Sequence, residues 1–225
     1  MHEVMQNMEG NMRNMKKLTA VICAVVATLS IAACGSSSEG TITSTTVATP
    51  TLSNETKAAE VKTTAAAGTS ATLAAPATGT EKVGTGYSLT FPATWVESTS
   101  AGCDMVMMNS ACTSTSFTTN INVVIEDVSA YGTMTSETYC EAAKSQFANT
   151  TGYTVTGTQK CSVNGVEAYT LTCDAVQSGI SYKIKQLYVV SGGKAYVTTF
   201  SAGADGTYEK DVVEGDSIFA TFQVK

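Results

Sequence analysis

The sequence predicts an α+β fold, in which helices flank a central antiparallel sheet, preceded by a signal peptide and a disordered tether. Short segments of alternating apolar and polar residues follow one another from about residue 84 to the C-terminus, as half-buried strands do. Asn164-Gly165 and Ser191-Gly192-Gly193 separate two pairs of these segments, which is typical of hairpin turns. Helical patterns are inserted into this series of hairpins, which favours an antiparallel sheet.

The chain begins with a secretory leader. Arg13, Lys16 and Lys17 precede an uncharged run over residues 18–33, which is shorter than the ~20 residues of a membrane-spanning helix. A charged start, a short apolar run and small residues before the cleavage point are typical of a signal peptide. We therefore expect residues 1–33 to be a signal peptide that is removed.

The leader ends in Ile31-Ala32-Ala33-Cys34, which resembles the lipobox of bacterial lipoproteins: an aliphatic residue, two small residues and a cysteine. The resemblance implies that a diacylglyceryl group is attached to Cys34 and that cleavage occurs before it. Two acyl chains hold a protein stably on a membrane, whereas one is marginal. We expect a lipoprotein anchored to the cell membrane through Cys34 and facing the extracytoplasmic side. A plain signal peptide with a chance cysteine is the alternative.

Residues 34–81 form the predicted tether. They are rich in Thr, Ser and Ala, include Pro50 and Pro76, and contain no aromatic residue. Such a segment cannot bury enough apolar area to offset the entropy lost on ordering. We expect it to be a disordered spacer, dispensable for the folding of a globular domain over residues 84–225.

The first half of the domain predicts three strands and a helix. Residues 87–91 alternate apolar and polar side chains, and residues 104–109 and 120–128 indicate further strands. Thr135-Ser136-Glu137 then indicates the start of a helix, with Thr or Ser as its cap and Glu in its first turn. The apolar residues that follow at helical spacing are Tyr139, Ala142, Ala143 and Phe147.

The second half predicts four strands in series. Residues 153–162 and 166–175 form one hairpin across Asn164-Gly165, and residues 180–190 and 194–201 form another. These hairpins supply the centre of the antiparallel sheet.

The chain ends in a helical pattern, with an interruption expected at Gly215. The apolar positions of this pattern are Tyr208, Val212, Phe219 and Phe222. Its acidic positions are Asp205, Glu209, Asp211, Glu214 and Asp216. Because their spacing does not match a calcium-binding loop, we expect these carboxylates to form the solvated face of the last helix.

Several motifs of the domain carry a resemblance to a known family. They are Tyr87-Ser-Leu-Thr-Phe-Pro-Ala-Thr-Trp95, Ser136-Glu137, Val163-Asn-Gly-Val-Glu-Ala168, the pair Gln186-Leu-Tyr-Val-Val and Gly193-Lys-Ala-Tyr-Val-Thr-Thr-Phe200, and Ile218-Phe-Ala-Thr-Phe-Gln-Val224. Over residues 84–225 the chain resembles the PsbP superfamily, which is named for an extrinsic subunit of photosystem II and includes many bacterial lipoproteins. The resemblance implies an α/β/α sandwich with a central antiparallel sheet and no common catalytic residue.

Composition excludes several classes of function. From Cys34 onward the chain has ten lysines, no arginine and 17 acidic residues, a formal net charge of about −7. A nucleic-acid-binding protein needs a clustered basic surface instead. The one histidine, His2, lies in the leader, so the mature chain has no imidazole for a catalytic base or a His-ligated zinc site. We predict no catalytic residue, no metal and no cofactor.

The domain contains five cysteines that are candidates for disulfide bonds: Cys103, Cys112, Cys140, Cys161 and Cys173. Thiols of exported proteins usually oxidise. Cys103 and Cys112 flank a short segment and are the best local pair. Cys161 and Cys173 are expected on opposite faces of their hairpin and therefore should not pair. Cys140, on the helix, would bridge to one of those two and leave one free thiol.

Two classes of function remain. The first is a non-enzymatic protein-interaction or ligand-binding module, whose partner is an envelope protein or a small ligand. The second is a carboxylate- or cysteine-based hydrolase or redox protein of the cell envelope. Met105, Met107 and Met108 offer soft ligands for Cu(I), but packing in a strand and core is their expected role. Tyr87 and Trp95 could line a ligand groove and are likewise expected in the core.

Overall fold

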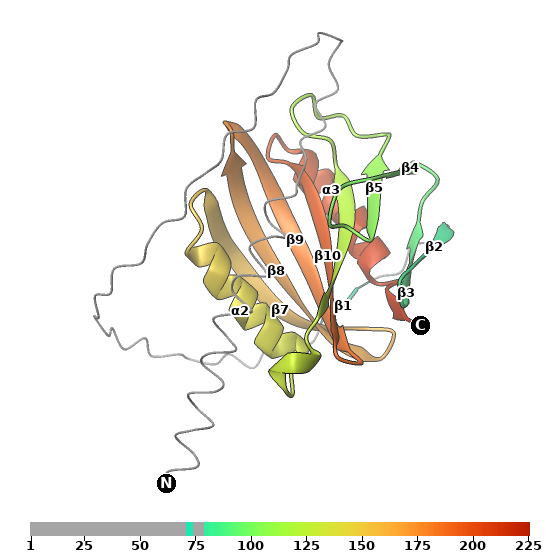
Figure 1. Cartoon of the computed structure of the whole chain (residues 1–225). Helices are drawn as coiled ribbons and strands as arrows, with labels where there is room; N and C mark the ends of the chain where they lie inside the picture. Colours follow the sequence, from blue (N-terminus) through green and yellow to red (C-terminus); the bar gives the residue numbers. More distant parts are fainter. Residues whose placement is uncertain (1–70, 74–78) are drawn as a thin grey trace, which may run out of the picture.

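The computed structural model describes residues 71–73 and 79–225, which form two sheets and two α-helices (Figure 1). The strands of the large sheet, in spatial order, are β1 (Ala71–Thr72), β7 (Tyr153–Val163), β8 (Val166–Gln177), β9 (Ile180–Ser191), β10 (Lys194–Gly203), β6 (Asn120–Asp127), β5 (Met105–Asn109) and β4 (Trp95–Ser98). The strands of the small sheet, in spatial order, are β11 (Gln223–Val224), β3 (Tyr87–Phe91) and β2 (Thr80–Gly84). The helices are α2 (Ser136–Ala148) and α3 (Thr207–Phe219), with a short 3-10 helix η1 at Ser129–Tyr131.

The two α-helices pack on opposite faces of the large sheet. Helix α2 contacts β7, β8 and β9, whereas α3 contacts β9, β10 and the small sheet through β3. The neighbouring strands of the large sheet are antiparallel, except for the parallel pair β1 and β7. The predicted fold class, a central antiparallel sheet flanked by helices, is therefore confirmed.

The meander from β7 to β10 is the centre of the sheet and follows the predicted hairpins. Asn164 and Gly165 both have positive φ angles, 46° and 80°, and join β7 to β8 with Val163 opposite Val166. These conformations are those of the type I′ turn that suits the twist of a two-residue hairpin. Gly192 and Gly193 have positive φ angles in the corresponding place between β9 and β10.

Helix α2 begins where the sequence predicts, at a capping box formed by two threonines. The Oγ1 atom of Thr135 accepts a hydrogen bond of 3.1 Å from the backbone N–H of Thr138, whose own Oγ1 accepts one of 2.9 Å from the backbone N–H of Thr135. These bonds satisfy N–H groups that a helix start otherwise leaves unpaired. The helix then buries Tyr139, Ala143 and Phe147 against the sheet.

Helix α3 is continuous, so the interruption expected at Gly215 is wrong. Gly215 is buried within the helix, and a Cβ atom placed on it would lie 2.7 Å from Cδ2 of Phe200 on β10. A glycine is therefore needed for close packing rather than for a break in the helix. Phe222 lies beyond the helix end, where its ring stacks on that of Tyr87 at 5.6 Å between centroids.

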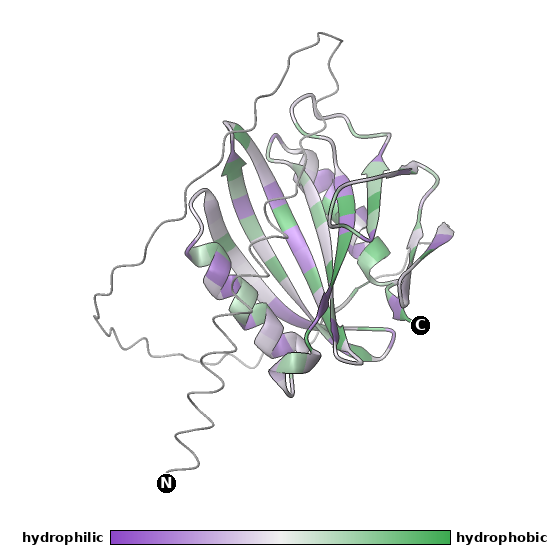
Figure 2. Ribbon diagram, viewed as in Figure 1, coloured by the Kyte–Doolittle hydropathy of each residue, from purple (hydrophilic) through white to green (hydrophobic). Residues whose placement is uncertain are grey.

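Two hydrophobic clusters fill the space between the large sheet and its helices. The α3-side cluster lies between the sheet, α3 and the small sheet and includes Phe91, Trp95, Leu187, Phe200 and Phe219. The α2-side cluster lies between the sheet and α2 and includes Tyr139, Phe147, Leu171, Tyr182 and Tyr188. Neighbouring residues of a strand point to opposite faces of the sheet, so Leu187 and Val189 of β9 lie in the α3-side cluster and Tyr188 between them lies in the α2-side cluster. Figure 2 shows hydrophobic residues along the strands of the large sheet.

A bulge in β7 changes which face of the sheet its side chains reach. Val155 lies opposite Cys173 and Gly157 opposite Thr172, so Thr156 is an extra residue in β7. Val155 packs in the α2-side cluster, whereas Cys161 and Val163 lie in the α3-side cluster. Since a shift of one residue reverses the facing of a strand, the bulge accounts for the change.

The ordered strands begin before the predicted domain boundary at residue 84. Strand β2 pairs its five residues with β3, from Thr80 opposite Phe91 to Gly84 opposite Tyr87. Upstream of it, β1 pairs with β7, and Leu73 packs against the α3-side cluster. The globular domain therefore includes residues 71–73 and 79–84, whereas the sequence assigned residues up to 81 to the tether and began the domain at residue 84.

Gly215→Ala tests the close contact between α3 and β10. Alanine favours a helix over glycine by about 1 kcal/mol, so an uncrowded site would be stabilised. We expect the opposite, a loss of about 1–3 kcal/mol in the free energy of unfolding, because the added methyl group overpacks the core against Phe200. Urea unfolding followed by Trp95 fluorescence measures it. Val213→Ala, at an exposed position of the same helix, is the control and should change stability little.

Truncation tests the revised domain boundary. A chain that starts at Gly84 should unfold at lower urea concentration than one that starts at Ala71, because it lacks β2 and the packing of Leu73. The expected loss is roughly 1–3 kcal/mol, the scale of one buried apolar side chain. A chain starting at Gly79 separates the contribution of β2 from that of β1. Equal stability of all three chains would contradict the revised boundary.

Candidate functional site

The leader, the lipobox and Cys34 lie outside the described residues, so lipidation and export remain predictions. Within residues 71–73 and 79–225, neither helix has the length and apolar content needed to cross a membrane. The functional candidates that the structure can locate all belong to the domain.

The cysteine pair predicted as the best local bridge is separated by a strand. Strand β5 lies between Cys103 and Cys112 and pairs with β4 on one side and β6 on the other. Five extended residues hold their ends about 13 Å apart, whereas the Cα atoms of bridged cysteines lie within about 7 Å. This geometry weighs against the Cys103–Cys112 pairing, which stays a prediction, because the segment between the two cysteines is a paired strand.

Three further cysteines are buried on two faces of the sheet. Cys140 on α2 and Cys173 on β8 belong to the α2-side cluster, and Cys161 on β7 belongs to the α3-side cluster. Cys161 and Cys173 thus lie on opposite faces, as predicted. A bridge from Cys140 to Cys161 would have to cross the sheet, so Cys173 is the partner on the same face. The structure has free thiols at all three positions, and their oxidation stays a prediction.

Burial makes these three thiols poor nucleophiles. Loss of solvation raises the pKa of Cys140 to about 12 and the pKa values of Cys161 and Cys173 to about 11. The thiolate is the reactive form, and at neutral pH such thiols are almost entirely protonated. This finding weighs against the cysteine-based enzyme that the sequence left as an alternative.

The methionines of β5 do not gather into a copper site. Met107 is fully buried in the α3-side cluster, and Met105 packs against the same cluster. Met108 follows Met107 in the strand. Its side chain points to the other face of the sheet, because the side chains of neighbouring strand residues point to opposite faces. Core packing, the expected role, accounts for Met105 and Met107. Among the described residues, no group of three or more His, Cys, Asp or Glu side chains is placed to hold a metal ion.

The two aromatic residues that could have lined a groove are core residues. Tyr87 is completely buried and Trp95 is 5% exposed. The Trp95 ring packs on Phe91, and its Nε1–H donates a 3.1 Å hydrogen bond to Oε2 of Glu214 on α3. Trp95 therefore fixes the helix to the sheet.

The acidic stretch at the C-terminus is not simply a solvated helix face, and that prediction is wrong. Each carboxylate contacts another element. Three of them accept hydrogen bonds: Asp205 from Ser114 Oγ at 2.7 Å, Asp211 from Thr119 Oγ1 at 2.6 Å, and Glu214 from Trp95. The other two form ion pairs: Glu209 with Lys183 at 2.6 Å, and Asp216 with Lys185 at 2.5 Å. The partners come from β4, β9 and the segment between β5 and β6, so the acidic residues attach α3 to its surroundings. Sequence spacing alone gives no sign of these partners.

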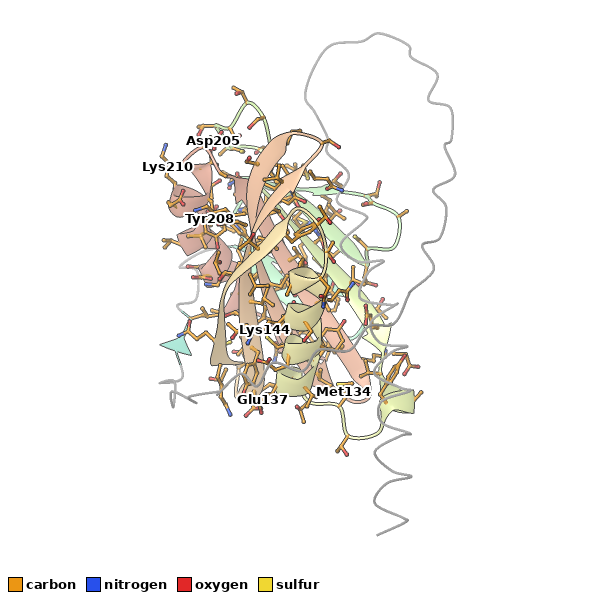
Figure 3. The ribbon with its side chains drawn as sticks, turned by 90° about the vertical axis from the view of Figure 1, so that its left-hand side faces the viewer. Met134, Glu137, Lys144, Asp205, Tyr208 and Lys210 are labelled. Carbon is orange, nitrogen blue, oxygen red and sulfur yellow. The ribbon has the colours of Figure 1, made fainter. Side chains whose placement is uncertain are left out.

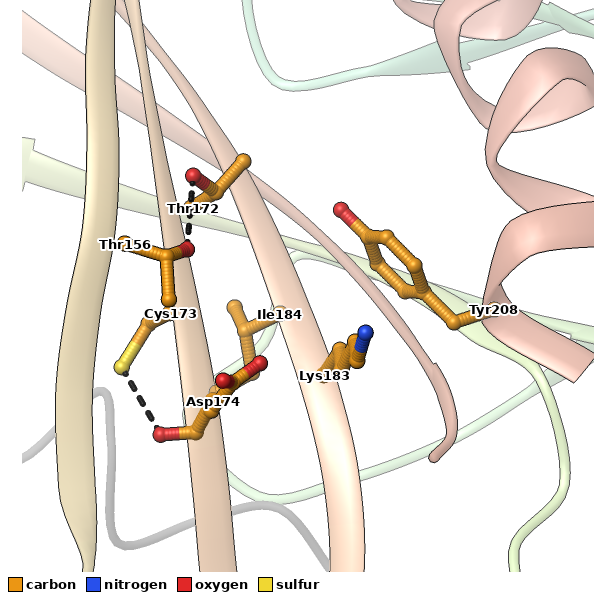
Figure 4. Close-up of a pocket in the computed structure, with 7 residues that line it drawn as sticks. All are labelled: Thr156, Thr172, Cys173, Asp174, Lys183, Ile184 and Tyr208. Carbon is orange, nitrogen blue, oxygen red and sulfur yellow. Dashed lines mark hydrogen bonds between the residues drawn. The ribbon is translucent and has the colours of Figure 1, made fainter. Parts of the chain in front are cut away.

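A small polar pocket lies where α3 meets the meander (Figure 4). Its volume is about 240 Å³, and its lining residues are Thr156, Thr172, Cys173, Asp174, Lys183, Ile184 and Tyr208. They come from β7, β8, β9 and the first turn of α3. Figure 3 shows Tyr208 at this end of α3, close to Asp205 and Lys210. Apart from Cys173 and Tyr208, sequence analysis singled out none of these residues.

Hydrogen bonds organise the strand side of the pocket. The bulge leaves Thr156 as the extra residue of β7, and its Oγ1 donates a 3.0 Å hydrogen bond to Oγ1 of Thr172. Thr172 in turn donates to the backbone oxygen of Gly157 at 3.4 Å. Asp174 and Lys183 lie opposite one another on neighbouring strands. The carboxylate of Asp174 makes none of the hydrogen bonds or ion pairs found among the described residues.

The helix side of the pocket is formed by Tyr208 and by the ion pair of Lys183. The Lys183 ammonium lies 2.6 Å from Glu209 and 5.5 Å from the centroid of the Tyr208 ring. Its hydrogen bond with Glu209 raises the pKa of Lys183 and lowers that of Glu209. Burial raises the pKa of Tyr208 to about 12. The pocket therefore presents the ammonium group of Lys183 beside a Tyr208 phenol that is neutral at neutral pH.

The cysteine of the pocket faces away from it. Cys173 belongs to the α2-side cluster, and its thiol donates a 3.2 Å hydrogen bond to the backbone oxygen of Asp174. The groups available to a ligand are thus the hydroxyl groups, Asp174 and Lys183. This set suits reversible binding of a small polar molecule.

Known proteins resemble this chain in structure but not in sequence. No family model matches the sequence, and no curated protein matches it. Among solved structures, cyanobacterial PsbP from Synechocystis is 17% identical, with a TM-score of 0.46 over 62% of this chain and 87% of its own. LpqN, described as involved in cell envelope biogenesis of Mycobacterium tuberculosis, is 15% identical, with a TM-score of 0.47 over 65% and 85%.

The Ran-binding protein Mog1p of Saccharomyces cerevisiae is 9% identical, with a TM-score of 0.43 over 65% of this chain and 96% of its own. At these identities the likenesses concern the fold alone.

Thiol labelling tests the burial of the three cysteines. In reduced, folded protein at pH 8, iodoacetamide should modify Cys140, Cys161 and Cys173 very slowly, because they are buried and have raised pKa values. In urea all three should react at the rate of a model thiol. Peptide mass spectrometry gives the modified positions. Half-buried Cys112 is the internal control and should react sooner. Rapid labelling of Cys173 in the folded state would contradict the assigned facing.

Proposed function

We propose that this chain is a membrane-anchored extracytoplasmic lipoprotein whose domain is a non-enzymatic module that binds a small polar ligand. The pocket between α3 and the meander is the observation that supports the binding role. It combines a carboxylate that has no hydrogen-bond partner among the described residues with an ammonium group and several hydroxyl groups. Convergent polar groups in a concavity are typical of small-molecule sites.

The size of the pocket limits the ligand. A volume of about 240 Å³ is below the ~300–1,000 Å³ of sites for drug-sized molecules. The ligand is therefore about one ring in size, or it is one residue of a longer chain whose remainder lies outside the pocket.

The lining groups favour binding over catalysis. A cysteine-based mechanism needs a thiolate, but the pKa of Cys173 is raised to about 11 and its thiol points to the opposite face. A paired-carboxylate mechanism needs a second acid beside the first. Among the described lining residues, Asp174 is the only carboxylate, and nearby Glu209 is held by Lys183.

The leader supports the location. Arg13, Lys16 and Lys17, the short apolar run and Ile31-Ala32-Ala33-Cys34 together have the order of a lipoprotein signal. Lipid on Cys34 would hold the domain at the membrane surface, with the intervening residues as a spacer. In this proposal the partners are the membrane, reached through the lipid, and the small ligand, held by the domain.

Cys34→Ser tests the anchor. The variant should take up no radioactive fatty acid and should be either uncleaved or shed from the membrane, because the serine hydroxyl cannot form the thioether. Metabolic labelling followed by cell fractionation measures both effects. Cys23→Ser, in the apolar run of the same leader, is the matched control and should be labelled and membrane-bound like the natural chain. Equal labelling of the Cys34→Ser chain would refute the lipidation site.

A further inference from the structure

The chemistry of the pocket points to a class of ligand. We propose that it binds a neutral, polyhydroxylated ring, such as a single sugar residue, through Asp174, Lys183 and Thr156. The inference rests on the proposed binding function and names its ligand. It follows from the donors and acceptors that remain available, from the local charge and from the arrangement of the strands.

The pocket offers both hydrogen-bond donors and hydrogen-bond acceptors to a ligand. The Asp174 carboxylate only accepts hydrogen bonds, and its oxygens are not used by the described residues. Lys183 has three N–H donors, one of which is directed to Glu209. Thr156 donates to Thr172 and keeps its lone pairs as acceptors. A site that offers both donors and acceptors matches hydroxyl groups, since each hydroxyl donates one hydrogen bond and accepts others.

The side chains of Asp174 and Lys183 lie next to each other at the pocket. Asp174 on β8 and Lys183 on β9 are directly opposite in the antiparallel register, and the Cβ atoms of such pairs lie about 4.5–5.5 Å apart. Figure 4 shows both side chains beside the same space, with Tyr208 across from Lys183. An acceptor and a donor side by side can each contact one of two neighbouring hydroxyl groups on a ring.

The net charge at the pocket favours a neutral ligand. Asp174 and Glu209 are anionic and Lys183 is cationic, so the groups at the pocket sum to about one negative charge. The mature chain is itself acidic. A carboxylate or phosphate ligand would be repelled, and the charge of Lys183 is already balanced by Glu209. A cation would be attracted by Asp174, but it would have to approach the Lys183 ammonium. A neutral polyol avoids both penalties.

The experiment is a titration of the complete mature chain, from residue 34 onward, followed by amide chemical shifts. The probes are methyl glucoside and methyl mannoside as neutral rings, choline as a cation and glucuronate as an anionic sugar. We expect the neutral glycosides to produce saturable shifts at residues 172–174, 183 and 184, and to bind more tightly than glucuronate. Choline should leave these signals in place.

Three variants assign the effect to the pocket. Asp174→Asn and Thr156→Val should each weaken binding of the glycosides, with about a tenfold loss for Asp174→Asn because it removes the charge from a hydrogen-bonded acceptor. Glu137→Gln changes an exposed carboxylate on α2, far from the pocket residues in sequence and on the other face of the sheet (Figure 3). This control should bind like the natural chain, and circular dichroism confirms that each variant is folded.

The outcomes separate the ligand class from the proposed function. If choline or glucuronate shifts the pocket signals and the glycosides do not, the class is wrong, but binding at the pocket stands. If none of the probes shifts these signals, the ligand class falls and the pocket loses its support as the binding site. Glycoside binding that is unchanged in both Asp174→Asn and Thr156→Val would overturn the assignment of these residues.

Discussion

The contact between α3 and the meander is the interaction on which the rest of the domain depends. Gly215 allows the helix to approach Phe200, and Ile218 and Phe219 then pack in the same cluster as the small sheet. The helix is also held by carboxylates that reach β4, β9 and the segment between β5 and β6. Because Tyr208 and Glu209 lie in the first turn of this helix, its position also determines the shape and the charge of the pocket.

The bulge at Thr156 has a comparable influence on the strands. It lets one strand contribute Val155 to the α2-side cluster and Cys161 to the α3-side cluster. It also leaves Thr156 unmatched in the ladder, with its hydroxyl bonded to Thr172 at the pocket. Bulges commonly re-aim a side chain near a functional site, and here the same residue serves the packing of the sheet and the polar lining of the pocket.

Several carboxylates of this domain form hydrogen bonds or ion pairs with other elements instead of facing only solvent. Only 14% of the residues are charged, yet the five acidic residues around α3 each contact another element. On the other face, buried Glu126 accepts a 2.7 Å hydrogen bond from Tyr139, and burial raises the pKa of this carboxyl group. The carboxylate of Asp174 differs from these, because it faces a pocket and makes no such bond among the described residues. Asp174 is exposed at the pocket and is therefore open to a ligand.

Local sequence signals by themselves determined the hairpins, the start of α2 and the fold class. Asn164-Gly165 can adopt the positive φ angles of its turn, and Thr135 can cap a helix, whatever the remainder of the chain does. The prediction of a leader and the net charge likewise rest on the sequence alone. Tertiary structure decided the role of Gly215, the partners of the acidic stretch and the placement of a paired strand between Cys103 and Cys112. It also created the pocket, because Thr156 and Tyr208 are distant in sequence and meet only when α3 packs on the sheet.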